Sequence, residues 1–146
     1  MKKIIIINGP NLNLLGNREN NIYGNQSIND IKTLSEKKCL DLNLECFFYQ
    51  SNNEGEIINH IQLAEKDYDG VIINPAAFTH TSIAILDALR TISKPKIEIH
   101  LSNIYNREMY RKNSITSEGV DGLICGFGHL SYLLAIEAIY NLIKNK

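Results

Sequence analysis

Short apolar runs alternate with segments of helical period along the whole chain, and this alternation limits the fold more than any single motif. The runs have the length and the β-branched, apolar character of buried strands in a parallel sheet. They cover residues 4–7, 45–50, 70–74, 96–101 and 122–125. The helical segments between and after them begin near residues 27, 53, 81 and 129. The pattern therefore predicts an α/β fold in which helices cover both faces of a parallel sheet.

The strand and helix order also predicts where a ligand would bind. Five strands with right-handed crossovers favour a doubly wound, three-layer fold with the flavodoxin-like strand order 2-1-3-4-5. A chain of 146 residues suits one domain, which we expect to span residues 1–146. In such a sheet the loops after the first, third and fourth strands border one crevice at the switch point. We therefore expect the functional side chains to come from these three loops.

Polar residues mark the starts of the predicted helices. Ser27, with Asp30 three residues later, fits a capping box. The third helix is expected over residues 81–93, with Thr79 or Thr81 as its cap. Between the fourth and fifth strands the chain is polar and shows no clear period, so at most a short helix is expected there.

Composition and charge argue against several classes of function. The net charge of −1 offers no basic surface for nucleic acid. No stretch approaches the ~20 apolar residues of a membrane span, so we expect no membrane partner. The three cysteines are widely spaced, which favours free thiols in a reducing cytoplasm over a disulfide framework. The four histidines lack the spacing of metal ligands, so we expect no metal.

The loop after the first strand carries the first candidate site residues. The side chain of Asn11 suits the orientation of a substrate or a water, although Asn and Gly are also ordinary turn residues. Arg18 and Tyr23 lie five positions apart on the same loop. A nearby cation favours the phenolate form of a tyrosine, and a phenolate is a competent base. We interpret this loop as a flap over the crevice; an ordinary surface tyrosine is the alternative.

A second set of candidates follows the third and fourth strands. Glu98 and His100 alternate with apolar residues and so lie on one face of a strand, where neither should be buried without a partner. Glu98 either orients His100 for acid–base chemistry or forms an ion pair that is only structural. His80, at the predicted helix start, suits donation to a ligand oxygen. Arg107 and Arg111 either form a solvated helix face or bind a carboxylate at the crevice.

Four motifs together resemble those of the type II 3-dehydroquinate dehydratases. They are NGPNLNLLG at residues 8–16, Arg18 with Tyr23-Gly24, NPAAFTHTS at residues 74–82 and EIHLSN at residues 98–103. Their order and spacing extend the resemblance over nearly the whole chain. Several long motifs in the right order are far more specific than any single short pattern.

The resemblance implies a lyase that dehydrates 3-dehydroquinate to 3-dehydroshikimate through an enolate. It implies a flavodoxin-like fold, no metal or organic cofactor, and a homo-oligomer, namely a dodecamer built of trimers. The reaction belongs to the shikimate pathway, which leads to chorismate and the aromatic amino acids. The same reaction in quinate breakdown is the alternative role.

The resemblance also implies roles for the candidate residues. Tyr23 takes the proton next to the ketone, and Arg18 favours its phenolate. Asn11 helps to hold a water that stabilises the enolate. His100 then protonates the departing hydroxyl group, with Glu98 positioning its ring.

Further positions match the substrate-binding residues of the family. They are Asn74, His80, Leu101, Ser102 and Arg111. Asn74 is also expected to help position His100. Asp87 matches a residue that reaches the site of a neighbouring subunit. The substrate is a polyhydroxylated carboxylate, which suits such a polar and cationic set.

A flavodoxin-like module that binds a small ligand, such as a flavin or a nucleotide, is the rival interpretation. Such a module would need a phosphate-binding loop after the first strand. Residues 11–15 fit neither the GxGxxG pattern nor the P-loop pattern. The motifs therefore favour the enzyme.

Overall fold

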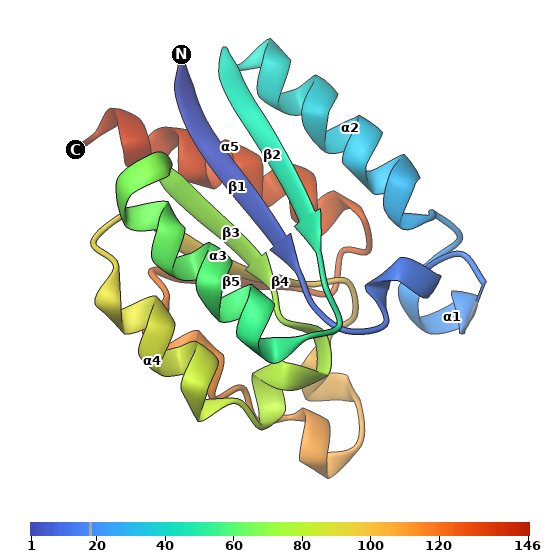
Figure 1. Cartoon of the computed structure of the whole chain (residues 1–146). Helices are drawn as coiled ribbons and strands as arrows, with labels where there is room; N and C mark the ends of the chain where they lie inside the picture. The colour runs from blue at the N-terminus through green and yellow to red at the C-terminus, as the bar shows by residue number, and fades with distance from the viewer. Residues whose placement is uncertain (18) are drawn as a thin grey trace.

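The computed structural model describes residues 1–17 and 19–146, and its centre is a parallel sheet of five strands. The spatial order is β2-β1-β3-β4-β5, as the sequence predicted (Figure 1). The strands are β1 (Lys2–Asn8), β2 (Leu44–Gln50), β3 (Gly70–Asn74), β4 (Lys96–His100) and β5 (Gly122–Cys125). The flavodoxin-like order is therefore confirmed.

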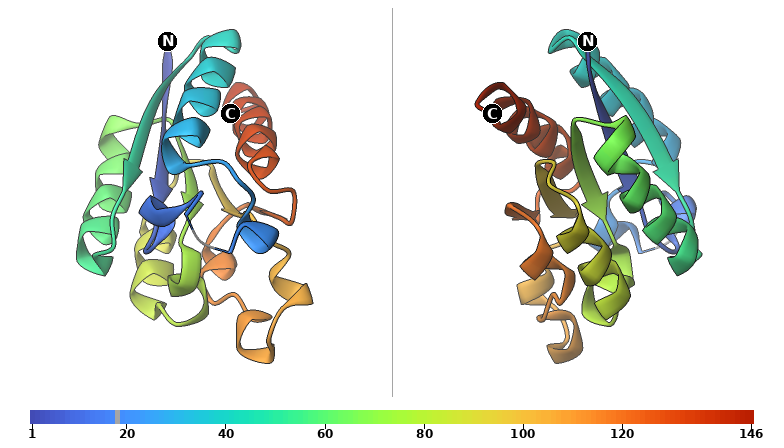
Figure 2. Two further views of the ribbon diagram at one scale, coloured as in Figure 1. Left: turned by 90° about the vertical axis from the view of Figure 1, so that its right-hand side faces the viewer. Right: turned by 60° about the vertical axis from the view of Figure 1, so that its left-hand side comes forward.

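Four long helices cover the two faces of the sheet and make the fold three-layered (Figure 2). They are α2 (Ile28–Asp41), α3 (Glu54–Asp67), α4 (Ile83–Thr91) and α5 (Leu130–Lys144). One core lies under α2 and α5 and takes Ile4 and Ile6 from β1; the other lies under α3 and α4 and takes Ile5 and Ile7. Successive strand residues point to opposite faces, so the isoleucine run fills both cores. Each fully buried isoleucine stabilises the fold by roughly 1.5–3 kcal/mol.

The predicted helix starts are confirmed in two cases and corrected in a third. Ser27 and Asp30 form the predicted capping box at α2, each side chain accepting a hydrogen bond from the other's backbone N–H at 3.0 Å. Asn53 caps α3 through its side-chain oxygen, which accepts from the Glu56 backbone N–H. For α4 the expected cap was wrong: Ser82 caps the helix, and its Oγ accepts from the Ile85 backbone N–H at 2.9 Å.

The correction at α4 has a local cause. Residues after Pro75 form a 3-10 helix, η2 (Ala76–His80), in which Ala76 has a φ of 53°. The chain therefore needs two more residues before α4 begins, and His80 ends η2 instead of opening α4. The Thr79 side chain is turned into the protein interior, where it contacts Glu98. Thr79 is thus unavailable as a cap.

The remaining short elements gather at the carboxyl ends of the strands (Figure 1). They are η1 (Leu12–Leu14), α1 (Asn20–Tyr23), η3 (Ile104–Asn106), η4 (Met109–Arg111) and η5 (Thr116–Gly119). The last three form the polar stretch between β4 and β5, where the sequence predicted at most one short helix. Both termini lie at the opposite end of the molecule. None of the helices described has the length and apolar character that crossing a membrane requires.

Candidate active site

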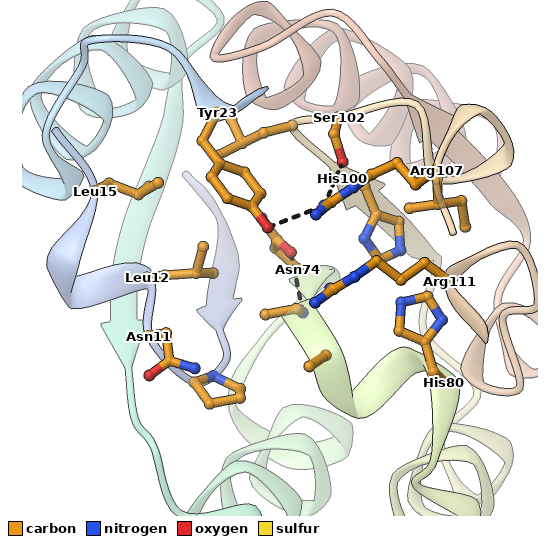
Figure 3. Close-up of a pocket in the computed structure, with 15 residues that line it drawn as sticks. Asn11, Leu12, Leu15, Tyr23, Asn74, His80, His100, Ser102, Arg107 and Arg111 are labelled. Carbon is orange, nitrogen blue, oxygen red and sulfur yellow. Dashed lines mark hydrogen bonds between the residues drawn. The ribbon is translucent and has the colours of Figure 1, made fainter. Parts of the chain in front are cut away.

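A cavity of about 160 Å³ opens at the carboxyl ends of β1, β3 and β4, where the sequence predicted the crevice (Figure 3). Its walls come from the loop after β1, from η2 after β3, and from the segment after β4. The lining residues are Pro10, Asn11, Leu12, Leu15, Tyr23, Asn74, Ala76, Ala77, His80, His100, Leu101, Ser102, Ile104, Arg107 and Arg111. Three segments far apart in the sequence thus build one site.

Most of the predicted site residues lie on this cavity. Those that line it are Asn11, Tyr23, Asn74, His80, His100, Leu101, Ser102 and Arg111. Glu98 lies one layer deeper, with none of its surface exposed. Asp87 is exposed on α4 and is not part of the cavity wall. Arg18 lies outside the residues that the structure describes, so its role stays a prediction.

Glu98 and His100 form a hydrogen-bonded pair at the end of β4. Nε2 of His100 lies 2.8 Å from Oε2 of Glu98. Because Nε2 is engaged with the carboxylate, Nδ1 is the ring nitrogen left to meet a ligand. The carboxylate thereby fixes the orientation of the imidazole, with Nδ1 placed for proton transfer. The geometry supports the acid–base interpretation of this pair.

Three hydroxyl groups hold the Glu98 carboxylate from behind. Oε1 accepts from Thr116 at 2.5 Å, and Oε2 accepts from Ser114 at 2.8 Å and from Thr79 at 2.9 Å. Burial alone would raise the pKa of Glu98, but the hydrogen bond and charge of His100, with the Thr116 and Ser114 hydroxyls, lower it below its ordinary value. Glu98 is therefore an anion that faces His100 in a buried site.

The phenol of Tyr23 is hydrogen-bonded to Arg107, which was not among the predicted site residues. Nη1 of Arg107 donates to the Tyr23 hydroxyl oxygen at 2.9 Å, and the guanidinium carbon lies 5.3 Å from the ring centroid. The same Nη1 lies 3.4 Å from Oγ of Ser102 (Figure 3). The sequence left open whether Arg107 belongs to a solvated helix face or to the crevice, and the structure favours the crevice. The only signal was a guanidinium in the segment after the fourth strand.

His80 presents a hydrogen-bond acceptor to the cavity. Its Nδ1 lies 2.7 Å from the backbone oxygen of Asn113, and a carbonyl can only accept, so Nδ1 carries the proton. Burial lowers the pKa of His80, and the nearby cationic side chains act in the same direction. A neutral ring protonated at Nδ1 leaves a lone pair on Nε2. The sequence had suggested a hydrogen-bond donor here; the bond to Asn113 occupies the Nδ1–H, so Nε2 is the ring nitrogen that remains for a ligand.

Cationic and neutral groups dominate the polar wall of the cavity. Arg107 and Arg111 both line it, and no Asp or Glu does among the residues described. Nε of Arg111 lies 3.1 Å from Oε2 of Glu108, which is half-exposed outside the wall. A planar guanidinium suits the bidentate recognition of a carboxylate. The cavity is thus built for a small anionic ligand.

Asn11 is held in position by its own backbone. It has a φ of 69°, in the left-handed region that asparagine tolerates better than most residues. Its backbone N–H donates to Oδ1 of Asn52 at 2.9 Å. This bond is made by the backbone of Asn11 and not by its side chain, and the residue lies on the cavity wall.

In residues 1–17 and 19–146, no three His, Cys, Asp or Glu side chains come close enough together to hold a metal ion.

Comparison with known proteins assigns the chain to a family. The family model described as dehydroquinase class II matches residues 2–140. The chain belongs to the class II dehydroquinase family. A 3-dehydroquinate dehydratase of Clostridium botulinum (strain Okra / Type B1) is 52% identical over 147 residues, which is 100% of this chain and 100% of that protein.

Solved structures agree with the class II dehydroquinase assignment. A type II dehydroquinase from Butyrivibrio crossotus DSM 2876 superposes with a TM-score of 0.93 at 46% identity, covering 94% of this chain and 97% of that one. A short-chain flavodoxin associated with a bacterial microcompartment aligns over 98% of this chain and 99% of its own, with a TM-score of 0.53 and 6% identity. That second likeness concerns the fold alone.

Proposed function

We propose that this chain is a lyase that removes water from 3-dehydroquinate to give 3-dehydroshikimate. One observation carries the proposal: Tyr23, at the end of α1, and His100, at the end of β4, both line one cavity, and each is hydrogen-bonded to a charged partner. A phenol beside a cation suits a base, and an imidazole beside a carboxylate suits an acid. An elimination of water needs one of each. Membership of the class II dehydroquinase family names the substrate.

The first chemical step is proton abstraction by Tyr23. The phenolate takes a proton from the carbon next to the substrate ketone, and the C–H electron pair passes to the ketone oxygen as an enolate. Arg107 favours the phenolate because its Nη1 donates to the phenolic oxygen. Arg18 is proposed, from the family resemblance, as a second cation for the same purpose. Asn11 is proposed to hold the water that donates to the enolate oxygen.

The second step is loss of the hydroxyl group. The enolate re-forms the ketone, its electron pair makes the new carbon–carbon double bond, and the carbon–oxygen bond to the hydroxyl breaks. Hydroxide is a poor leaving group, so Nδ1 of His100 donates a proton and water departs. Glu98 supports this donation because its bond to Nε2 holds the His100 ring in place. The hydroxyls behind Glu98 hold that charge in place.

Substrate binding is proposed to use the remaining polar wall. Arg111 suits the substrate carboxylate, and Nε2 of His80 suits a substrate hydroxyl as an acceptor. Asn74 and Ser102, together with the backbone at Leu101, complete the set. The Asn74 side chain bonds to Tyr132 and Ala76, so its expected help in orienting the His100 ring rests on the family resemblance alone.

The assembly and the cellular role are proposed from the family resemblance. Asp87 is exposed and lies outside its own cavity, which fits a residue that serves the site of a neighbouring copy. A dodecamer of trimers would supply such copies. We propose that residues 1–146 act as one catalytic domain in the cytoplasm. The shikimate route to chorismate is the proposed role, and quinate breakdown is the alternative.

The test is an absorbance assay with 3-dehydroquinate, because the product is a conjugated enone that absorbs where the substrate does not. We expect the parent protein to give a rise in absorbance and Tyr23→Phe to lose about 10²- to 10⁴-fold in kcat, as removal of a catalytic base does. Tyr68→Phe, at the end of α3, is the matched control and should keep full activity. A folded parent that gives no rise would overturn the assignment. A purified protein that is yellow or retains nucleotide would favour the ligand-binding module.

A further inference from the structure

A buried tyrosine beneath the cavity links two asparagines that lie side by side in the sheet. Tyr132, on α5, has no exposed surface. Its hydroxyl lies 2.6 Å from Oδ1 of Asn8 and 2.9 Å from Nδ2 of Asn74. Asn8 and Asn74 are register partners at the carboxyl ends of β1 and β3. One phenol therefore joins the ends of the two central strands to a helix on one face.

These hydrogen bonds form a series that begins at the Tyr49 backbone oxygen and ends at Asn74. The direction of each bond follows from the Tyr49 end of the series. Nδ2 of Asn8 lies 3.0 Å from the backbone oxygen of Tyr49, which can only accept, so Asn8 donates there through its amide nitrogen. Its Oδ1 must then accept, and the Tyr132 hydroxyl donates its single proton to it. The phenol oxygen is left as an acceptor, which requires Nδ2 of Asn74 to face it. The carbonyl of Tyr49 thus decides which way round the Asn74 amide lies.

The other half of the Asn74 amide agrees with this orientation. Its Oδ1 accepts from the backbone N–H of Ala76 at 3.1 Å, so a flipped amide would place two donors together at that point. After both contacts the side chain retains one N–H and one oxygen lone pair. Asn74 lines the cavity, so these are the groups it can offer a ligand. Burial raises the pKa of the Tyr132 phenol well above its ordinary value, so the phenol keeps its proton.

We propose that Tyr132 is a positioning residue that fixes the orientation of the Asn74 amide at the substrate cavity. Packing alone would be served as well by a phenylalanine, because the ring sits among apolar core residues such as Phe48, whose ring centroid is 6.2 Å away. A buried hydroxyl is costly without partners, and here both of its partners are strand-end asparagines. The catalytic consequence rests on the proposed dehydratase function, whereas the hydrogen-bond arrangement does not.

The kinetic test compares Tyr132→Phe, Asn74→Ala and the double variant in the 3-dehydroquinate assay. We expect Tyr132→Phe to lose about 10- to 100-fold in kcat/KM, the loss expected when a buried polar group is left unpaired. It should divide this loss between kcat and KM in the same proportion as Asn74→Ala. On the Asn74→Ala background, Tyr132→Phe should cause no further loss. Tyr140→Phe, eight positions later on the same helix and outside this set of hydrogen bonds, is the matched control.

The outcomes separate this inference from the proposed function. Additive losses in the double variant, or full activity in Tyr132→Phe, would overturn the positioning role. A parent without activity would overturn the dehydratase assignment, and the decision would then pass to NMR. In Tyr132→Phe the side-chain NH₂ signals of Asn74 should lose protection from hydrogen exchange. Those of Asn8 should keep it, because Asn8 donates to Tyr49. Unchanged protection at Asn74 would sink the proposal without any reference to catalysis.

Discussion

The guanidinium of Arg107 donates from Nη1 to the phenolic oxygen of Tyr23 at 2.9 Å, across 84 positions of sequence. The proposed base therefore has a cationic partner that does not come from its own loop. The segment after β4 brings this cation to the cavity and also carries Arg111. Movement of the loop after β1 would change the distance between base and cation.

Replacement of Arg107 tests this relationship. Arg107→Met removes a charged hydrogen bond to the phenol, so we expect kcat to fall about 10- to 100-fold. Arg107→Lys should lose less, because the charge remains. Steady-state assays provide the measurement, and Arg90→Met, exposed on α4, is the control. An unchanged kcat in Arg107→Met would remove Arg107 from the mechanism.

The hydroxyl groups behind Glu98 provide a second test. Thr116→Val keeps the shape of the side chain but removes the donor that lies 2.5 Å from Oε1 of Glu98. We expect the pKa of Glu98 to rise towards its ordinary value and kcat to fall about 5- to 30-fold, because one hydrogen bond to a charged group is lost. Thr33→Val is the control, since its hydroxyl donates to the backbone oxygen of Asn29 on the exposed side of α2. Equal kinetics for the two variants would show that this hydroxyl does not support the acid.

The ionisation of Glu98 should appear in the pH dependence of stability. Its pKa is lower in the folded protein than its ordinary value, which is about 4.3 in an unfolded chain. As the pH falls, the unfolded chain binds the proton first, so the stability that Glu98 contributes is present above about pH 4.3 and is lost as the pH falls through the folded pKa.

Urea denaturation of the parent and of Glu98→Gln from neutral pH to about pH 3 measures this contribution. The free energy of unfolding of the parent should fall more steeply below about pH 4.3 than that of the variant. Glu118→Gln, at an exposed position of η5, is the control and should follow the parent curve. Parallel curves for the parent and Glu98→Gln would contradict the lowered pKa.

Gly9 tests how closely the loops after β1 and β3 approach each other. A Cβ atom at Gly9 would lie 2.4 Å from the backbone oxygen of Pro75. The Gly9 N–H also donates to the backbone oxygen of Asn74 at 2.8 Å. Gly9→Ala should destabilise the fold by about 1–3 kcal/mol, since backbone must shift to relieve the overlap. Gly122→Ala, where a Cβ meets nothing within 4 Å, is the control. Thermal and urea unfolding of both variants measure the difference; equal stability would contradict the predicted overlap.

Short-range patterns in the sequence predicted the sheet and much of the site. The five apolar runs and the capping box at Ser27 were predicted correctly, because strand burial and helix capping depend on residues close together in the chain. The pairing of Glu98 with His100 was also predictable, because a spacing of two places both side chains on one face of a strand. The four motifs after the first, third and fourth strands, taken together, likewise indicated the family, which the family model over residues 2–140 confirmed.

By itself, then, the sequence determined the α/β fold, its strand order, the edge of the sheet that holds the site and most of the residues there. Only the tertiary structure decided that Arg107 meets Tyr23, that Thr79 binds Glu98 instead of capping α4, and that the Tyr132 hydroxyl accepts from Asn74. These contacts join different elements of the fold across 84, 19 and 58 positions. No periodic pattern encodes them, because they depend on where packed loops bring individual polar atoms within about 3 Å of each other.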